Sequence, residues 1–243
     1  MIRFLLWDVD GTLLDFKAAE RAAVIRLFEE FSLGPCTEEM VRRYSRINET
    51  FWQRLERNEI SKRRVLTGRF EQFFREIGVP VSLAEEFNRR YQHRLGDTVV
   101  YRDDSIGIVR NLRGTVKQYV VSNGTAVAQS RKLALSGLGG LMDGVFLSEE
   151  LGFEKPNKGF FDAVFSRIRP ENPAEVMIVG DSLTSDIRGG MNAGIVTCWY
   201  NPERRETPEG YRVDHVIADL HEVPSLILYG AGEPAAENRK KEE

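Results

Sequence analysis

The strongest constraint on this chain is a pair of aspartates that follows its first apolar run. Residues 2–7 are apolar apart from Arg3 and predict a buried strand. Asp8 and Asp10 come next, and the Gly-Thr pair after them predicts a sharp turn out of a sheet. Because successive side chains of a strand point to opposite faces, the two carboxylates are expected on the same face. Adjacent carboxylates repel each other unless a cation or a shared proton intervenes, so the pair indicates either a cation site or an ordinary solvated turn.

Residues 16–96 predict a helical insert. Apolar side chains recur there at helical spacing in four segments, and Gly-Pro at 34–35 and Gly-Val-Pro at 78–80 mark two of the breaks. No strand pattern interrupts this stretch, so the insert is expected to be all-helical. We interpret the aromatic residues at this spacing as its core, since apolar periodicity usually marks a buried face.

The remainder of the chain alternates between strand and helix patterns, which predicts a parallel sheet covered by helices on both faces. The expected fold class is therefore α/β, with a Rossmann-like parallel sheet. We expect residues 1–15 and 97–230 to form this core, residues 16–96 an inserted helical domain, and residues 231–243 a flexible charged tail. The predicted strands span residues 119–122, 144–147, 176–179, 195–199 and 215–217, and the predicted helices 125–135, 158–168, 187–192 and 219–228.

The composition excludes several classes of partner. With 42% hydrophobic and 29% charged residues the chain is typical of globular proteins, and its net charge of −3 disfavours nucleic-acid polymers and membranes. No apolar run approaches the roughly 20 residues that span a bilayer, and Arg3 interrupts the first one, which therefore does not predict a signal peptide. We expect a cytoplasmic protein in which Cys36 and Cys198 are buried free thiols.

The charge is distributed unevenly. The insert carries an excess of Lys and Arg, whereas the rest of the chain carries an excess of Asp and Glu. A basic insert above an acidic sheet edge would suit an anionic substrate held through a metal. The alternative, which we favour, is a solvated helix face, because exposed helix faces are usually charged. That face would be formed by Arg42, Arg43, Arg54, Arg57, Arg63 and Arg64.

Further polar stretches stand at predicted strand ends and helix starts, where the chemistry of parallel sheets is located. Ser122, Asn123 and Gly124 end one strand and precede a helix, so a hydroxyl and backbone N–H groups converge in a candidate phosphate site. Lys155 could neutralise phosphoryl oxygens and pair with a nucleophilic carboxylate. Taken alone, residues 122–124 are also typical of an ordinary turn. Lys155 taken alone is also typical of a surface lysine at the start of a helix.

Asp181 and Asp186 form a last stretch. Asp181 stands at a strand end, and Asp186 is expected about one turn into the following helix, close enough to join the same carboxylate cluster. Mg²⁺ prefers one or two carboxylates together with water and substrate phosphate, which Asp8 and Asp181 would provide. Ser182 or Thr184 is expected to cap the helix.

Together these stretches resemble the haloacid dehalogenase-like (HAD) hydrolase superfamily, in their order and in their placement on the strands. The resemblance spans residues 2 to about 229 and implies that the helical insert is the mobile cap of that family. The matching residues are Asp8, Asp10, Gly11, Thr12, Ser122, Lys155, Gly180, Asp181 and Asp186.

For catalysis, the resemblance implies that Asp8 is a nucleophile that forms an aspartyl-phosphate. Asp10 would protonate the leaving alcohol and then activate water, while Ser122 and Lys155 would hold the phosphoryl oxygens. A carboxylate nucleophile divides the hydrolysis into two displacements, and electrostatics supplies most of the catalysis. Dehalogenating members lack an acid at the position of Asp10, since halide leaves without a proton, so its presence implies phosphate esters.

For the metal, the resemblance implies a Mg²⁺ site completed by Asp8, Asp181 and the backbone carbonyl of Asp10. Asp186 would orient that cluster or reach the metal through water.

A narrower resemblance, to the noncanonical-pyrimidine 5′-nucleotidase branch, comes from the surroundings of these motifs. It implies a small phosphorylated metabolite as substrate, a nucleoside 5′-monophosphate before others. Lys132 stands where Arg is expected and Asn157 where Asp is commoner, and we assign neither a catalytic role. The stretches that carry this resemblance are residues 122–138, 148–156 and 180–202.

Other interpretations stay open because the insert, which usually selects the substrate, carries no motif that we can match. A sibling phosphatase would act on a sugar phosphate, phosphoglycolate or an acylneuraminate phosphate, and a phosphomutase would return the phosphate to the sugar. A non-catalytic binding module of the same fold is disfavoured, because all the matching carboxylates and Lys155 are present.

Overall fold

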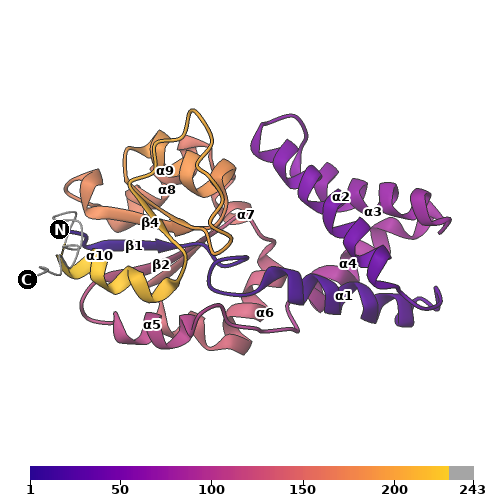
Figure 1. Cartoon of the computed structure of the whole chain (residues 1–243). Coiled ribbons are helices and arrows are strands. Elements are labelled where there is room, and N and C mark those ends of the chain that lie inside the picture. The colour runs from indigo at the N-terminus through magenta and orange to yellow at the C-terminus, as the bar shows by residue number, and fades with distance from the viewer. Residues whose placement is uncertain (230–243) are drawn as a thin grey trace, which may run out of the picture.

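The computed structural model describes residues 1–229 of the chain, so the predicted tail at 231–243 lies outside the described residues. A parallel sheet of six strands, in the order β3-β2-β1-β4-β5-β6, forms the centre of the fold (Figure 1). This confirms the predicted α/β class and Rossmann-like sheet. The strands are β1 (Phe4–Trp7), β2 (Lys117–Ser122), β3 (Gly144–Leu147), β4 (Val176–Gly180), β5 (Val196–Tyr200) and β6 (His215–Ile217).

Helices cover both faces of the sheet, which is why its strands are apolar on both sides. Leu5 and Trp7 of β1 pack with the apolar residues of α5 and α10 on one face. Leu6 points to the opposite face and packs with those of α8. The helices of this part are α5 (Ser105–Asn111), α6 (Ala126–Ser136), α7 (Ser148–Leu151), α8 (Lys158–Ile168), α9 (Arg188–Ala193) and α10 (Val223–Tyr229).

The stretch between residues 16 and 95 holds the four predicted helices and no strand. These helices lie beyond the carboxyl ends of the strands, on the side to which the arrow of β1 points (Figure 1). The division of the chain into a core and an inserted domain at these bounds stays a prediction. The helices are α1 (Phe16–Glu30), α2 (Glu38–Glu56), α3 (Lys62–Ile77) and α4 (Ala84–Leu95).

The starts of these helices follow from local chemistry. The side chains of Asp15, Thr37 and Ser61 each accept a backbone N–H from the first turn of α1, α2 and α3. Gly78 ends α3 with φ of 73°, a left-handed conformation that glycine adopts without steric cost.

The core of the four helices is aromatic, as their spacing predicts. The rings of Tyr44 and Phe70 stack with centroids 4.9 Å apart. Phe87 and Tyr91 pack on Phe70 at 5.0 Å and 5.1 Å. These side chains are fully buried, so they stabilise the helical layer mainly by removing apolar surface from water.

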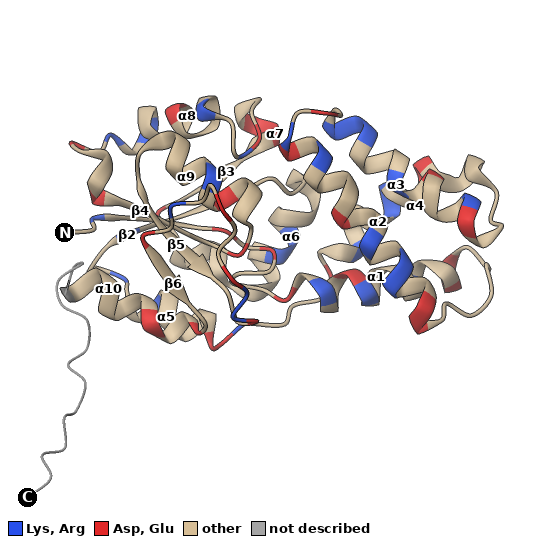
Figure 2. Ribbon diagram, turned by 45° about the horizontal axis from the view of Figure 1, so that its top comes forward, with Lys and Arg blue, Asp and Glu red and all other residues tan. Residues whose placement is uncertain are grey.

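The arginines expected on a solvated helix face lie at the surface of the insert, whose helices carry both blue and red residues in Figure 2, whereas Arg69 of α3 is buried. Arg43 pairs with Glu39, and Arg64 pairs with Glu71. Arg42 and Arg63 are exposed. The structure thus favours the solvated helix face over a basic surface reserved for an anion.

Three local features differ from the prediction. Helices α5 and α7 were not predicted, because their seven and four residues are too few for a helical period to show. The segment Leu183–Ile187 forms a π-helical turn ahead of α9 rather than a plain helix start. The predicted helix at 219–228 is divided into a 3₁₀ turn, Leu220–Glu222, and α10, because Asp219 and Glu222 form a capping box there.

Cys198 is a buried free thiol, as predicted, whereas Cys36 is only half-buried because it lies in the loop between α1 and α2. Among residues 1–229 no helix combines the length and the apolar character that crossing a membrane requires.

Replacing Phe70 by Ala should destabilise the helical insert by about 3–5 kcal/mol, because it leaves a cavity among buried rings. Urea denaturation monitored by circular dichroism measures this change. Phe153→Ala, which removes a ring that is 44% exposed, is the matched control and should change the unfolding curve little. Equal effects of the two substitutions would contradict this view of the insert core.

Candidate active site

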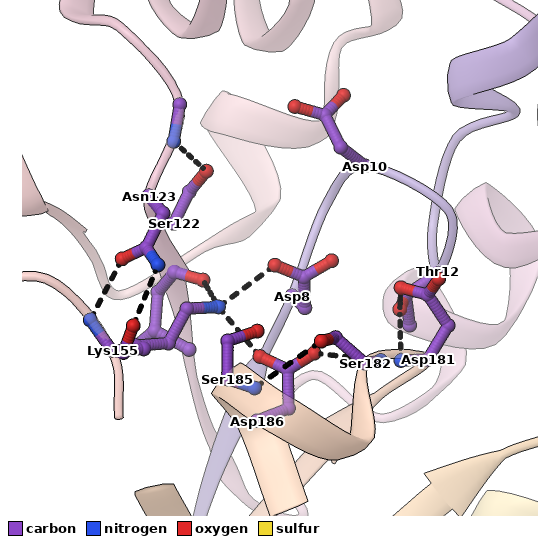
Figure 3. Close-up of polar contacts among 12 residues, drawn as sticks. Asp8, Asp10, Thr12, Ser122, Asn123, Lys155, Asp181, Ser182, Ser185 and Asp186 are labelled. Atoms are coloured by element: carbon purple, nitrogen blue, oxygen red, sulfur yellow. Dashed lines mark hydrogen bonds and ion pairs between the residues drawn. The ribbon is translucent and has the colours of Figure 1, made fainter. Parts of the chain in front are cut away.

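The side chain of Lys155 contacts residues at the carboxyl ends of several strands of the sheet. Its Nζ lies 2.8 Å from Asp8 Oδ1 and 2.7 Å from Asp186 Oδ1, and it also donates to the carbonyl oxygen of Val121 at 2.8 Å (Figure 3). Lys155 is 1% exposed, so its charge depends on these partners. Burial alone would lower the pKa of Lys155, but Asp186 and Asp8 outweigh it and raise that pKa above its ordinary value.

A third carboxylate, that of Asp181, completes a buried acidic group. One oxygen from each of Asp8, Asp181 and Asp186 lies within 4.8 Å of the other two. Thr12 fixes Asp181 by donating to its Oδ1 at 3.1 Å and accepting its backbone N–H at 3.0 Å. Gly11, at φ of 98°, makes room, since a Cβ there would lie 2.5 Å from Asp181 Oδ2.

The electrostatics of this group fits a divalent cation. Burial raises the pKa of Asp8 well above its ordinary value, and Asp186 and Asp181 add to that rise against the opposing charge of Lys155. Burial and Asp186 raise the pKa of Asp181 to about 7. Lys155 uses one oxygen of Asp8 and Thr12 one oxygen of Asp181, so each carboxylate keeps a second oxygen. Carboxylate oxygens are the ligands that Mg²⁺ prefers.

Both carboxylate oxygens of Asp186 have hydrogen-bond partners within the protein. Its Oδ1 faces Lys155, and its Oδ2 accepts the backbone N–H of Ser182 at 3.2 Å. Ser182 also caps the π-helical turn by accepting the N–H of Ser185, whereas Thr184 contacts Glu56 instead. Of the two predicted caps, Ser182 is therefore the one that the structure contains.

The loop after β2 forms the opposite wall. Ser122 Oγ accepts the backbone N–H of Gly124 at 3.0 Å. The side-chain amide of Asn123 makes two 2.8 Å hydrogen bonds to the backbone of Lys155, one through its nitrogen and one through its oxygen. Asn123 therefore positions Lys155 with its side chain, and only its backbone is left to contact a ligand.

These side chains surround a small pocket of about 160 Å³, and the structure brings every predicted site residue to it. Three residues of the helical insert, Phe16, Trp52 and Glu56, complete the lining. The predicted residues that line it are Asp8, Asp10, Ser122, Asn123, Gly124, Lys155, Asp181 and Asp186.

Asp10 stands apart from the acidic group, above Asp8 in Figure 3. Gln129 Nε2 donates to its Oδ2 at 2.5 Å, and Lys132 forms an ion pair with its Oδ1. Lys132, to which we assign no catalytic role from the sequence, thus contacts a proposed catalytic residue, because α6 turns this side chain inward to Asp10. Asn157 is structural, as expected, since its side chain caps α8.

Sequence reasoning missed the contributions of the insert. Glu56, at the end of α2, accepts a hydrogen bond from Thr184, and burial raises the pKa of Glu56 to about 7. Lys62, at the start of α3, donates to Ser148 Oγ at 2.9 Å. These contacts join the tip of the insert to loops of the sheet, and no motif marks them because the partners are far apart in sequence.

A wider groove of about 560 Å³ leads away from the pocket between α2 and the loop after β5. Asp10, Trp52 and Glu56 border both the pocket and the groove. Tyr200, which is 1% exposed, and Arg205, which is exposed, also line the groove. Its volume is in the range of small-molecule sites, so a ligand anchored at Lys155 has room to extend along α2.

Residues 2–194 match the haloacid dehalogenase-like hydrolases. The chain belongs to this family. The family resemblance inferred from the aspartates, Ser122 and Lys155 is thereby confirmed.

Among HAD hydrolases, the HAD-hydrolase YfnB of Bacillus subtilis is 38% identical over 227 residues, which cover 93% of this chain and 95% of YfnB. The magnesium-bound crystal structure of YfnB, which reveals interdomain movement, superposes with a TM-score of 0.86, 33% identity and coverage of 93% of this chain and 99% of YfnB. The pyrimidine 5′-nucleotidase PynA of Streptococcus pneumoniae is 34% identical, with 84% of this chain and 86% of PynA covered. The pyrimidine 5′-nucleotidase YjjG of Escherichia coli is 29% identical, with 92% and 97% covered.

Replacing Lys155 by Met should destabilise the metal-free protein by about 3–5 kcal/mol, because it leaves two buried carboxylates without their counter-charge. Chemical denaturation measures the free energy of unfolding. Lys158→Met is the matched control, since Lys158 pairs with Asp162 on the surface, and it should change stability little. A Lys155→Met protein as stable as this control would show that the buried ion pairs do not hold the loops together.

Proposed function

We propose that this HAD hydrolase is a Mg²⁺-dependent phosphatase that hydrolyses small phosphate monoesters through an aspartyl-phosphate on Asp8. The observation that carries the proposal is the placement of Asp8 in the pocket beside Lys155, with Asp10 at the border between pocket and groove. This arrangement offers a nucleophile, a cation for the phosphoryl group and an acid for the leaving group.

The reaction proceeds in two displacements. A carboxylate oxygen of Asp8 forms a bond to phosphorus while the ester P–O bond breaks and Asp10 gives its proton to the departing oxygen. Water then attacks the phosphorus of the aspartyl-phosphate and passes a proton to Asp10, and the bond between phosphorus and Asp8 breaks. Inorganic phosphate leaves, and both aspartates return to their starting states.

The phosphoryl oxygens are held by Ser122 Oγ, by Lys155 Nζ and by the backbone N–H of Asn123. Gly124 N–H takes part where a phosphoryl oxygen replaces Ser122 Oγ as its acceptor. Donors placed in advance at a water-poor site stabilise the charge of the transferring group at little reorganisation cost.

Asp8 and Asp181 would hold Mg²⁺ with the backbone carbonyl of Asp10, and Asp186 would orient the site or reach the ion through water. The ion would offset the negative charge of the phosphoryl group and of the carboxylates around it. The proximity of three buried acid oxygens and the raised pKa of Asp181 support this assignment.

We propose a nucleoside 5′-monophosphate as the substrate. The relatives YjjG and PynA are pyrimidine 5′-nucleotidases, and the alignments cover most of this chain. The groove that begins at Asp10 supports the proposal, because Phe16 and Trp52, which are partly exposed, line it and aromatic faces suit a base. The partners would thus be small metabolites, and a cytoplasmic location stays a prediction.

Asp8→Asn should lower kcat/KM for CMP and UMP by about 10⁴-fold or more, because the amide is a poor nucleophile. Phosphate release measures activity, and circular dichroism checks the fold. Asp162→Asn, a surface carboxylate on α8, is the control and should retain activity. Substantial turnover by Asp8→Asn would contradict the mechanism.

A panel of phosphate esters at equal enzyme concentration tests the substrate class. We expect the highest kcat/KM for nucleoside 5′-monophosphates. The nucleotide assignment would be refuted by a higher kcat/KM for a sugar phosphate, phosphoglycolate or an acylneuraminate phosphate, although the phosphatase mechanism would stand. Return of the phosphate to a sugar would identify a phosphomutase.

Adding Mg²⁺ to metal-free protein should raise the thermal unfolding midpoint, because binding to the native state stabilises it by about 2.7 kcal/mol at a hundredfold excess over Kd. Asp181→Asn should remove most of this shift, whereas Asp162→Asn should leave it as in the wild type. Differential scanning calorimetry measures both, and an undiminished shift in Asp181→Asn would place the ion elsewhere.

A further inference from the structure

Two side chains of α6 meet on Asp10 from inside the protein. Gln129 and Lys132 stand three residues apart on the first turns of this helix, so they share a face. Gln129 is 0% and Lys132 1% exposed. The Gln129 amide donates to one carboxylate oxygen of Asp10 and the Lys132 ammonium pairs with the other, so both oxygens are held.

The contact between Gln129 and Asp10 passes the loop after β2, residues 122–124, which we call the phosphate loop. A Cβ at Gly124 would collide with Nε2 of Gln129, so the glycine lets the Gln129 side chain pass the loop on its way to Asp10. Helix α6 itself starts at Ala126, directly after this loop, and Thr125 caps it. The carboxyl group of Asp10 and the phosphate loop are therefore placed by the same helix.

Neither Gln129 nor Lys132 is among the described residues that line the pocket or the groove, whereas Asp10 lines both. A substrate with its phosphate at Lys155 and its leaving group in the groove would place its ester oxygen next to Asp10. The two α6 side chains would then act on the reaction through Asp10 rather than by touching the substrate. Lys132 Nζ also lies 5.3 Å from the centre of the Phe16 ring, which lines both spaces, so the test must separate the two contacts.

We propose that Lys132 and Gln129 are positioning residues that fix the carboxyl group of Asp10 beside the ester oxygen of the substrate. This inference rests on the proposed role of Asp10 as the acid. A carboxyl group held at both oxygens keeps one orientation. Each oxygen has two lone pairs, so the one that accepts from Gln129 can carry the proton on the side of the substrate, while Lys132 stabilises the carboxylate that remains after the transfer. Proton transfer requires hydrogen-bond distance and alignment at the moment the ester bond breaks. Without the two donors the Asp10 carboxyl group can rotate, and proton transfer to the leaving oxygen becomes slower.

The dependence on the leaving group separates this role from a purely structural one. p-Nitrophenolate leaves without a proton, whereas the 5′-oxygen of CMP needs one. A loss of Asp10 alignment therefore affects CMP far more than p-nitrophenyl phosphate, while a distorted pocket affects both. The value of kcat/KM is the right measure, since it reports the steps up to departure of the leaving group.

The experiment compares kcat/KM for CMP and p-nitrophenyl phosphate in Lys132→Met, Lys132→Arg and the wild type. We expect Lys132→Met to lower the value for CMP by about 10²–10⁴-fold, the usual contribution of a general acid, and to lower that for p-nitrophenyl phosphate at least tenfold less. Lys132→Arg should restore most of the CMP activity, because it returns a cation to Asp10. Arg131→Met is the matched control, since Arg131 pairs with Asp97 on the surface, and should keep the wild-type ratio of the two substrates.

Gln129→Leu provides a second test if Lys132→Met does not fold, because it removes a donor and leaves the buried ion pair. Gln129→Leu should also lower kcat/KM for CMP more than that for p-nitrophenyl phosphate, but by a smaller factor than Lys132→Met. Equal losses on both substrates, or no loss, in the folded variants would overturn the positioning role. A wild-type protein that hydrolyses neither ester would overturn the proposed function itself, and with it this role of Asp10.

Discussion

The buried ammonium of Lys155 is the interaction on which the rest of this active site depends. It contacts Asp8 after β1, the carbonyl of Val121 in β2 and Asp186 after β4, while Lys155 itself belongs to the loop between α7 and α8. Without that charge, acidic side chains brought together by neighbouring parallel strands would repel each other in a poorly solvated place. Lys155 also lines the pocket, so in the proposed mechanism the charge that holds the loops together would also attract the phosphate.

The helical insert contacts the loops at the carboxyl ends of the strands and closes one side of the pocket. Thr125, which caps α6, donates to Gln92 of α4 at 2.8 Å. On the other side of the pocket, Lys62 reaches Ser148 and Glu56 reaches Thr184. The insert thus contacts the loops after β2, β3 and β4, and its side chains form one wall of both pocket and groove. In the proposed mechanism, residues at the sheet edge would therefore carry out the reaction, and the insert would bound the space for the leaving group.

Much of this arrangement could be predicted from the sequence because parallel strands end at one edge. Asp8, Ser122 and Asp181 each follow an apolar strand, so their meeting follows from topology alone. Lys155 is a candidate from its residue type and position, but alone it is equally a surface lysine at a helix start, and the family resemblance is what favours the functional interpretation. The roles of these residues in catalysis stay predictions.

The contacts that sequence reasoning missed depend on tertiary packing. Lys132 reads as an ordinary helix residue, and only the direction of α6 against the strand ends brings it to Asp10. Glu56 lies in a segment of charged residues, and its burial arises because α2 ends directly above Thr184. Neither pairing is marked by spacing, because 122 and 128 residues separate the partners.

The central claim is that Asp8 carries the phosphoryl group during turnover. Its most direct test is a rapid acid quench of the enzyme during hydrolysis of a nucleoside monophosphate, followed by peptide mass spectrometry. The account predicts that the peptide containing Asp8 gains the mass of one phosphoryl group and that this gain disappears in the absence of substrate. A phosphoryl group found only on another peptide would contradict it.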